Sequence, residues 1–135
     1  MPVKMAIPVL RVSSVEGSLQ WYRGALGFIG DPFPAEPPYA FASLRQVGGA
    51  EIMLRRGTPR SRPGPRAYDW DVYLRLEQTP IRDLYARFQA AGLVTRRLER
   101  MFYGLAEFEV TDPDGYVLCL SQQVENADDL PTPTV

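Results

Sequence analysis

Apolar residues in the first third of the chain follow the spacing of a strand and then of a helix. Residues 6–12, AIPVLRV, are rich in branched apolar side chains and run into two serines, which predicts a strand that leads to a helix cap. Either Ser13 or Ser14 caps the helix, and Gly27 ends it. The apolar positions that recur at helical spacing are Val15, Leu19, Tyr22 and Leu26.

The middle of the chain alternates between proline-rich and strand-like segments. Residues 29–40 hold four prolines, which predicts a loop with a stiff backbone. Residues 41–56 then predict two strands joined by a tight turn at Gly48 and Gly49. Residues 57–68 contain Pro, Gly, Ser and Arg without a periodic apolar face, which predicts a linker whose arginines are solvated.

The second half repeats this pattern of polar and apolar positions. Residues 70–78 alternate like a strand, and an amphipathic helix follows between Pro80 and Gly92. Residues 105–123 predict a hairpin that turns at Asp114 and Gly115. The last residues, 123–135, are polar and contain proline, which predicts a flexible tail.

Corresponding residues in the two halves are separated by a nearly constant distance along the chain. Such an offset over a strand, a helix and a hairpin indicates an internal repeat, although few residues are identical between the halves. The pairs are Arg11 and Arg75, 64 residues apart, Tyr22 and Tyr85, 63 apart, and Gly49 and Gly115, 66 apart.

Composition narrows the function. The chain has 135 residues with 15 basic and 16 acidic side chains, so no large net charge favours nucleic acid or an anionic membrane. No apolar run is long enough to span a membrane, and a single cysteine agrees with a reducing compartment, so we expect a cytoplasmic protein. The absence of histidine excludes Ser-His-Asp, Cys-His and His-based zinc chemistry.

Four motifs carry a family resemblance: IPVLRV before a capped helix, WYRGALGF at its end, GGAEIML, and YGLAEFEVTDPDGYVLCL. Together they resemble the vicinal oxygen chelate superfamily of glyoxalases, bleomycin-resistance proteins and extradiol dioxygenases, over residues 6–122. The resemblance implies an α+β fold with two βαβββ modules, 6–56 and 69–122, joined by the linker 57–68 within a single domain, 1–122. It also implies sheets that curl around a cleft, commonly in a homodimer.

Strand alternation identifies the side chains expected to face that cleft. Val9 and Arg11 share one face of the first strand, and the opposite face is apolar and should be covered by a helix. Trp70 and Val72 are likewise expected on the helix-covered face of the second module. The predicted ligand-binding residues are Val9, Arg11, Phe41, Met53, Asp71, Tyr73, Arg75, Tyr103 and Glu107.

Members of the family that use a metal carry His, Glu or Gln at four strand positions. Carried over by resemblance, these positions are Ile7, Met53, Asp71 and Cys119, and two of them are hydrophobic. A register two residues different would bring in Glu51 and Asp69 without supplying a fourth ligand. We therefore expect neither a metal of the usual family type nor another cofactor.

Three smaller features have a structural interpretation beside a functional one. Asp112, Asp114 and Gly115 are expected to build a turn rather than to take part in chemistry. Cys119 is expected to be a small buried hydrophobe. Arg11 and Arg75 either hold an anionic ligand group or pair with acids, and the candidate acids are Glu51, Glu107 and Glu109.

The function expected first is that of a metal-free protein that sequesters a small organic molecule, similar to the bleomycin-resistance branch. The alternative is a lyase, isomerase or dioxygenase of the same superfamily. A metal-dependent form would need Asp71 with Glu51 or Glu107, and a metal-free form would use Glu107, Tyr73 or Tyr103 as acid or base. A third possibility is a dimeric interaction module, because one fold hosts unrelated activities.

Overall fold

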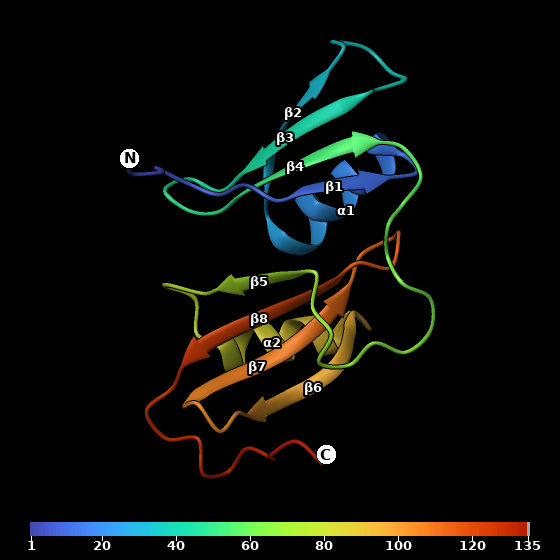
Figure 1. Cartoon of the computed structure of the whole chain (residues 1–135). Helices are drawn as coiled ribbons and strands as arrows, with labels where there is room; N and C mark the ends of the chain where they lie inside the picture. The colour runs from blue at the N-terminus through green and yellow to red at the C-terminus, as the bar shows by residue number, and fades with distance from the viewer. Residues whose placement is uncertain (135) are drawn as a thin grey trace. The chain divides into compact units, whose positions relative to one another are not determined.

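A computed structural model describes residues 1–134 of the chain as two compact units (Figure 1). Unit 1 comprises Met1–Ser61, and unit 2 begins at Arg62. Each unit contains one helix and one four-stranded sheet. No helix within residues 1–134 combines the length and the apolar character that crossing a membrane requires.

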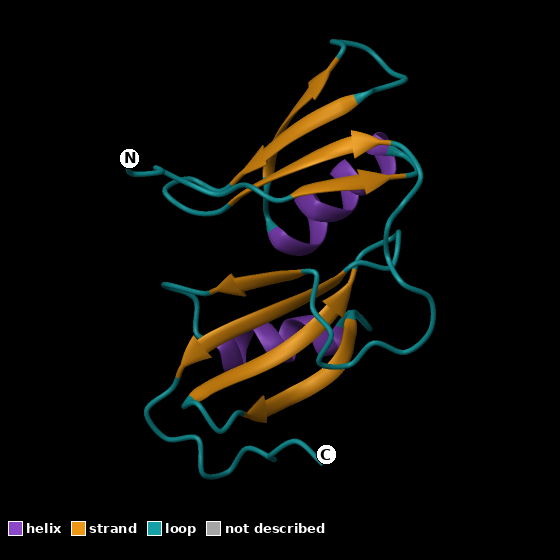
Figure 2. Ribbon diagram, in the orientation of Figure 1, coloured by secondary structure: helices purple, strands orange, loops and turns teal. Residues whose placement is uncertain are grey.

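Unit 1 is a βαβββ module. Its sheet has the strand order β1-β4-β3-β2, in which β1 is parallel to β4 and the other neighbours are antiparallel. The helix follows the first strand and covers one face of this sheet (Figure 2). The elements are β1 (Val9–Val12), α1 (Val15–Leu26), β2 (Ile29–Phe33), β3 (Phe41–Arg45) and β4 (Glu51–Arg56).

Unit 2 repeats that topology, with the strand order β5-β8-β7-β6 and a parallel pair formed by β5 and β8. Helix α2 lies against one face of the sheet (Figure 2). The α+β class and the two βαβββ modules are therefore confirmed. The elements are β5 (Val72–Arg75), α2 (Ile81–Ala90), β6 (Val94–Arg100), β7 (Leu105–Thr111) and β8 (Val117–Gln123).

Both helices begin and end where the sequence predicts. Ser14 caps α1, and its side chain accepts a hydrogen bond from the Gly17 amide at 3.1 Å. Gly27 ends α1 in the left-handed conformation, with φ of 72°. Pro80 immediately precedes α2, and Gly92, with φ of 71°, follows it.

Each core lies between a helix and one face of its own sheet. In β1, Leu10 and Val12 are buried while Val9 is 54% exposed, as the alternation predicts. In unit 2, Phe108 of β7 contacts the rings of Tyr85 and Phe88 on α2 at centroid distances of 5.3 and 5.8 Å. The opposite faces of both sheets are left uncovered by the helix of the same unit, and we call them the open faces.

The prediction of a loop over residues 29–40 is wrong in part, because its first five residues form β2. This strand lies at the edge of the sheet and pairs with β3, with Pro32 opposite Ala42. An edge strand has a neighbour on one side only, so some of its N–H groups have no strand partner. Proline, which lacks an N–H, is tolerated at such a position. The sequence pattern also did not reveal β6, which the family resemblance implied.

The strand predicted over residues 70–78 is shorter than expected and begins at Val72. Trp70 was expected on the helix-covered face, and this is wrong, because its indole Nε1 donates to Glu109 on the open face at 3.1 Å. Alternation does not apply to a residue that precedes the strand. Arg66, expected to be a solvated linker residue, is also misassigned, since its side chain is only 6% exposed.

The segment after β8 returns along α2 and β6 of its own unit. Arg82 of α2 forms a bidentate ion pair with Asp129, with both N–O distances at 2.9 Å. The backbone N–H of Arg100 donates to the carbonyl of Pro131 at 2.8 Å. These contacts attach the described part of the tail, 124–134, to unit 2, whereas residue 135 lies outside the described residues. The flexibility expected of the tail stays a prediction.

Candidate functional site on the open face of unit 2

The open face of the unit 2 sheet carries polar side chains because of strand alternation. In β7, the apolar residues Ala106, Phe108 and Val110 fall on one face, so the carboxylates of Glu107 and Glu109 fall on the other. Both carboxylates are nonetheless almost fully buried. Across to β8, Glu107 pairs with Ser121 and Glu109 pairs with Cys119. On the other side of β8, Arg75 of β5 pairs with Ser121 and Tyr73 pairs with Cys119.

An irregularity in β6 adds two more charged residues to this face. Arg96 pairs with Glu109 and Glu99 pairs with Glu107, and the register shifts between these two pairs. In a regular strand, residues three apart point to opposite faces. The bulge in β6 therefore brings Arg96 and Glu99 to the same side of the sheet, where both are buried.

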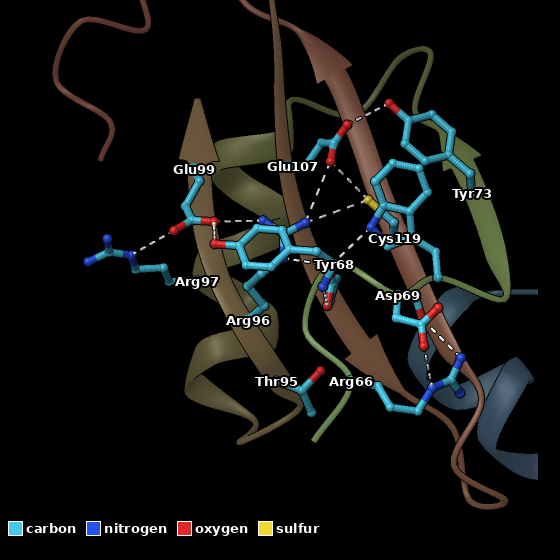
Figure 3. A network of polar contacts seen from close by, with 12 residues as sticks. Arg66, Tyr68, Asp69, Tyr73, Thr95, Arg96, Arg97, Glu99, Glu107 and Cys119 are labelled. Carbon is cyan, nitrogen blue, oxygen red and sulfur yellow. Dashed lines mark hydrogen bonds and ion pairs between the residues drawn. The ribbon is translucent and has the colours of Figure 1, made fainter. Parts of the chain in front are cut away.

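Arg96 lies at the centre of the resulting polar network (Figure 3). Its Nε donates to Glu109 Oε2 at 2.6 Å and its Nη1 donates to Glu99 Oε1 at 2.7 Å. Nη2 lies 3.5 Å from Glu107 Oε1. The ring of Tyr68 covers the guanidinium, with 4.3 Å between Cζ and the ring centroid. One buried cation thus faces three buried carboxylates.

Glu107 accepts from side chains on three strands and a turn. The hydroxyl of Tyr73 donates to Oε2 at 2.7 Å, and the hydroxyl of Tyr103 donates to the same oxygen. On the other oxygen, the Cys119 thiol lies 3.4 Å from Oε1, next to the Arg96 contact. Three hydrogen bonds and one ion pair thus engage both oxygens of this carboxylate.

The network shifts the pKa values of its members. Burial raises the pKa of Glu99, but hydrogen bonds from Tyr68, Arg96 and Arg97 outweigh burial and leave that pKa below its ordinary value. Burial and then the neighbouring Glu107 raise the pKa of Tyr103. Burial also raises the pKa of Tyr73. Hydrogen bonds with Ser121 and Arg75 lower that pKa and Glu107 raises it, so the pKa stays above its ordinary value. Both phenols therefore keep their protons at neutral pH.

The second half of the predicted linker forms part of this site. The backbone N–H of Tyr68 donates to the Glu109 carboxylate at 3.0 Å, and its hydroxyl donates to Glu99 at 2.7 Å. Tyr68 has φ of 68°, a conformation that a residue with a side chain rarely adopts without support. Arg66 anchors the same segment through Asp69 and Asp71. The sequence offered no signal for this network except the alternating glutamates of β7.

Asp71 is held by protein groups on both sides of its carboxylate. Arg66 donates to its two oxygens at 2.8 and 3.2 Å, and the backbone N–H of Val117 donates to Oδ2 at 2.8 Å. Arg75, in contrast, is exposed and makes no ion pair within residues 1–134. Its Nε donates to Ser121 at 3.0 Å, and its Cζ lies 5.7 Å from the ring of Tyr73.

Unit 1 carries the remaining predicted site residues on its own open face or near its edge. Val9 and Met53 are paired neighbours in β1 and β4, and Met53 also pairs with Ser43 of β3. Arg11 and Phe41 are half-buried. The predicted residues thus form two groups, one in each unit. In the unit 2 group, Tyr73 and Tyr103 are joined by hydrogen bonds to Glu107, and Arg75 adjoins the ring of Tyr73.

The four positions that correspond to metal ligands do not fit a metal. Ile7 and Met53 offer no hard ligand, and Asp71 already binds Arg66. The Cys119 thiol is buried next to Glu107, and burial and that carboxylate raise its pKa, which disfavours the thiolate a metal needs. No group of three or more Cys, Asp or Glu within residues 1–134 is arranged to hold a metal ion.

The turn between β7 and β8 is built as predicted. The side chain of Asp112 accepts hydrogen bonds from the backbone N–H groups of Asp114 and Tyr116, at 2.9 and 3.0 Å. Gly115 has φ of 90°, which glycine adopts without steric cost. Cys119 is free and fully buried, which confirms its assignment as a small buried residue.

Paired βαβββ modules, each with one helix-covered and one open sheet face, define a protein of the vicinal oxygen chelate class. The profile of the Glyoxalase/Bleomycin resistance protein/Dioxygenase superfamily matches residues 4–120. The chain therefore belongs to that superfamily, which confirms the family resemblance. No curated protein matches the chain significantly.

Solved structures agree on the fold. TioX from Micromonospora sp. ML1 is 20% identical with a TM-score of 0.68, covering 91% of this chain and 98% of TioX. A glyoxalase-related enzyme from Clostridium phytofermentans is 15% identical with a TM-score of 0.72, covering 92% and 98%. A virulence protein from Salmonella typhimurium is 24% identical with a TM-score of 0.64, covering 92% and 99%. At these identities the likeness extends to the fold alone.

Proposed function

We propose that the protein binds a small organic molecule without a metal and sequesters it, as a cytoplasmic homodimer of the bleomycin-resistance type. The observation that carries this proposal is the surface around Tyr73 on the open face of unit 2. Trp70 lies beside that ring at a centroid distance of 4.8 Å, and Arg75 lies next to it without an ion-pair partner in residues 1–134. Aromatic rings beside an available guanidinium suit a flat ligand with an anionic group.

The expected affinity comes mainly from the aromatic contact. Burying roughly 200 Å² of a flat ligand at about 25 cal/mol per Å² contributes about 5 kcal/mol before the costs of binding. That is too little for tight binding, so Arg75 supplies selectivity for an anionic group in addition. Val9, Arg11, Phe41 and Met53 of unit 1 offer a second surface of similar character, apolar with one arginine.

The metal-free part of the proposal is supported by how the acids are used. Glu107 accepts three hydrogen bonds and pairs with Arg96, and Asp71 is bound to Arg66 and to the Val117 amide. A metal would have to displace these donors. Purified protein should therefore carry no stoichiometric transition metal, and nickel, iron, manganese or zinc should not raise its melting temperature.

The alternative is an enzyme of the superfamily, a lyase, isomerase or dioxygenase. One observation favours a metal-free form: Tyr103 and Tyr73 both donate to Glu107, which places two acids and one base in a single hydrogen-bonded group. In this alternative Tyr103, which is 42% exposed, is the group nearest to solvent. Chromatography of a bound aromatic compound after incubation with the protein separates this function from sequestration. An enzyme converts the compound, whereas a sequestering protein returns it unchanged.

Binding is tested with a thermal-shift screen of aromatic acids, aromatic amines and neutral aromatics, followed by calorimetric titration of the best ligand. We expect an aromatic acid to bind best. Arg75→Ala should weaken that acid by about 1.5–3 kcal/mol, the range of a charge-assisted hydrogen bond, and leave the melting temperature nearly unchanged.

Arg87→Ala is the matched control, because it removes the same charge from α2 on the helix side of the same unit. It should leave the affinity unchanged. A lower melting temperature with unaltered affinity in Arg75→Ala would assign Arg75 a structural role. The absence of any ligand from all three classes would overturn the proposed function.

A further inference from the structure

The two tyrosine hydroxyls on Glu107 have a fixed hydrogen-bond polarity. A phenol has one hydrogen to donate, and both Tyr73 and Tyr103 direct theirs to the same carboxylate oxygen. The carboxylate beside Arg96 only accepts and has no hydrogen to give back, so neither phenol can reverse its role. The Tyr73 oxygen already has hydrogen bonds with Ser121 and Arg75, whereas only lone pairs remain on the Tyr103 oxygen. Toward a ligand, these hydroxyls can accept a hydrogen bond but cannot donate one.

Several features keep this polarity in place. Glu107 is fully buried, and its other oxygen is held by Arg96 and Cys119, which fixes the carboxylate in position. The raised pKa values of Tyr73 and Tyr103 keep both phenols protonated at neutral pH. Tyr103 is the more exposed of the two residues, at 42%, and its hydroxyl is the one without a second hydrogen-bond partner in residues 1–134.

Arg75 gives the same surface a second, opposite preference. Its guanidinium can only donate, and it adjoins the ring of Tyr73, whose hydroxyl shares Glu107 with Tyr103. The surface thus presents a cation that binds acceptors and a phenol oxygen that binds donors. A ligand that satisfies both carries an anionic group and, elsewhere on its ring, an O–H or N–H.

We infer that Glu107 is a positioning residue that sets ligand selectivity, so that the protein selects aromatic acids bearing a hydroxyl or amino group over those bearing only acceptors. This inference rests on the proposed function, because it names the ligand class of the same surface. Glu107 acts through Tyr73 and Tyr103 and does not itself touch the ligand.

The probes are benzoates substituted at the meta or para position, because all of them share the carboxylate that Arg75 would bind. Hydroxybenzoates and aminobenzoates carry a donor, whereas methoxybenzoates and nitrobenzoates carry acceptors only. Calorimetric titration of the wild-type protein should give tighter binding for the donor-bearing member of at least one positional pair. We expect a ratio of about tenfold, which corresponds to about 1.4 kcal/mol.

Glu107→Gln should reverse the preference. The amide oxygen can still accept from Arg96, which leaves the NH₂ group facing the two phenol oxygens as a donor. The phenol hydrogens must then turn away from residue 107, and the hydroxyls become donors toward the ligand. The ratio of affinities should therefore invert in favour of the methoxybenzoate or nitrobenzoate, an effect that a merely structural role of Glu107 would not produce.

Two further variants keep the test independent of the stability of Glu107→Gln. Tyr103→Phe removes the acceptor and keeps the ring, so it should bring the affinity ratio close to one. Glu99→Gln makes the same acid-to-amide change in the same network, but Glu99 contacts Tyr68 rather than Tyr73 or Tyr103, so the wild-type ratio should persist. Melting temperatures identify any variant that fails to fold.

Failure of the inference and failure of the proposed function give different results. Equal affinities within every positional pair, a wild-type preference for acceptor-only benzoates, or an unchanged ratio in Tyr103→Phe would overturn the inference while binding itself stands. If other aromatic compounds in the screen bind but none of these benzoates does, the inferred ligand class is also overturned. Only the absence of any ligand in the screen overturns the proposed function.

Discussion

Cys119 illustrates how neighbouring side chains suppress the reactivity of a single residue. Its thiol is fully buried on β8, and it lies against Glu107 at 3.4 Å and near Arg96 at 4.0 Å. Burial and the carboxylate raise the thiol pKa, and the arginine opposes them without reversing the shift. Since the thiolate is the nucleophile, the folded protein holds this group in its unreactive form.

We therefore predict that a disulfide reagent modifies Cys119 slowly in the folded protein at pH 8. The same reagent should react within the mixing time after unfolding in guanidinium, when the thiol pKa returns to its ordinary value of about 8.5. The absorbance of the released chromophore measures the reaction, and it is unambiguous because the chain has one cysteine. Rapid stoichiometric modification of the folded protein would contradict the prediction.

At the scale of residues, local rules predicted what depends on neighbours in sequence. The cap at Ser14 and the turn at Asp112 follow from side chains that bond nearby backbone groups. The alternation of Glu107 and Glu109 also predicts that they share a face. The network around Arg96 could not be predicted, because its members meet through a bulge in β6 and through a linker segment that has no periodic pattern.

At the scale of elements, the contact between α1 and the edge strand β2 depends on a glycine. A Cβ atom at Gly30 would lie 2.2 Å from Leu19 Cδ1 and 2.9 Å from Leu44 Cδ2. Both are side chains of the buried core, so space for a methyl group requires that these leucines, or the elements that carry them, shift. Small size therefore allows β2, despite its proline, to pack closely under α1.

We predict that Gly30→Ala lowers the free energy of unfolding by about 1–3 kcal/mol, the usual cost of overpacking a core. Gly24→Ala is the matched control within α1, because Gly24 is exposed and a Cβ there meets no atom within 4 Å. That variant should gain about 0.5–1 kcal/mol from helix propensity. Chemical denaturation of the three proteins measures both effects, and equal stability of Gly30→Ala and wild type would contradict the packing argument.

Strand boundaries were the least predictable feature of the elements. The prolines of residues 29–40 concealed β2, since a sequence pattern does not reveal that a strand will lie at the edge of a sheet. Trp70 was placed on the wrong face because alternation was extended two residues before β5 begins. Helices were predicted more accurately, because caps and periodicity are both local signals.

At the scale of the whole molecule, the internal repeat was the most informative signal in the sequence. The near-constant offset between the halves predicted equal topologies, and both sheets indeed have the order first, fourth, third, second strand of their module. The open faces also have a consequence for assembly. Each sheet is mixed, with one parallel pair, and its open face exposes apolar residues such as Val9 in unit 1 and Trp70 in unit 2.

Each helix covers only one face of its sheet, and we predict that a homodimer covers the exposed apolar residues of the open faces. Sedimentation at micromolar concentration should give a species of twice the 15.2 kDa chain mass. Val9→Glu tests whether the open face of unit 1 is covered, because a charge placed there would be buried at a cost. Val47→Glu is the control, since Val47 is 87% exposed in the turn between β3 and β4. Val9→Glu should melt several degrees below Val47→Glu. A 15.2 kDa species together with equal melting temperatures for the two variants would show that the open face of unit 1 is exposed to water. The predicted dimer would then have no physical basis.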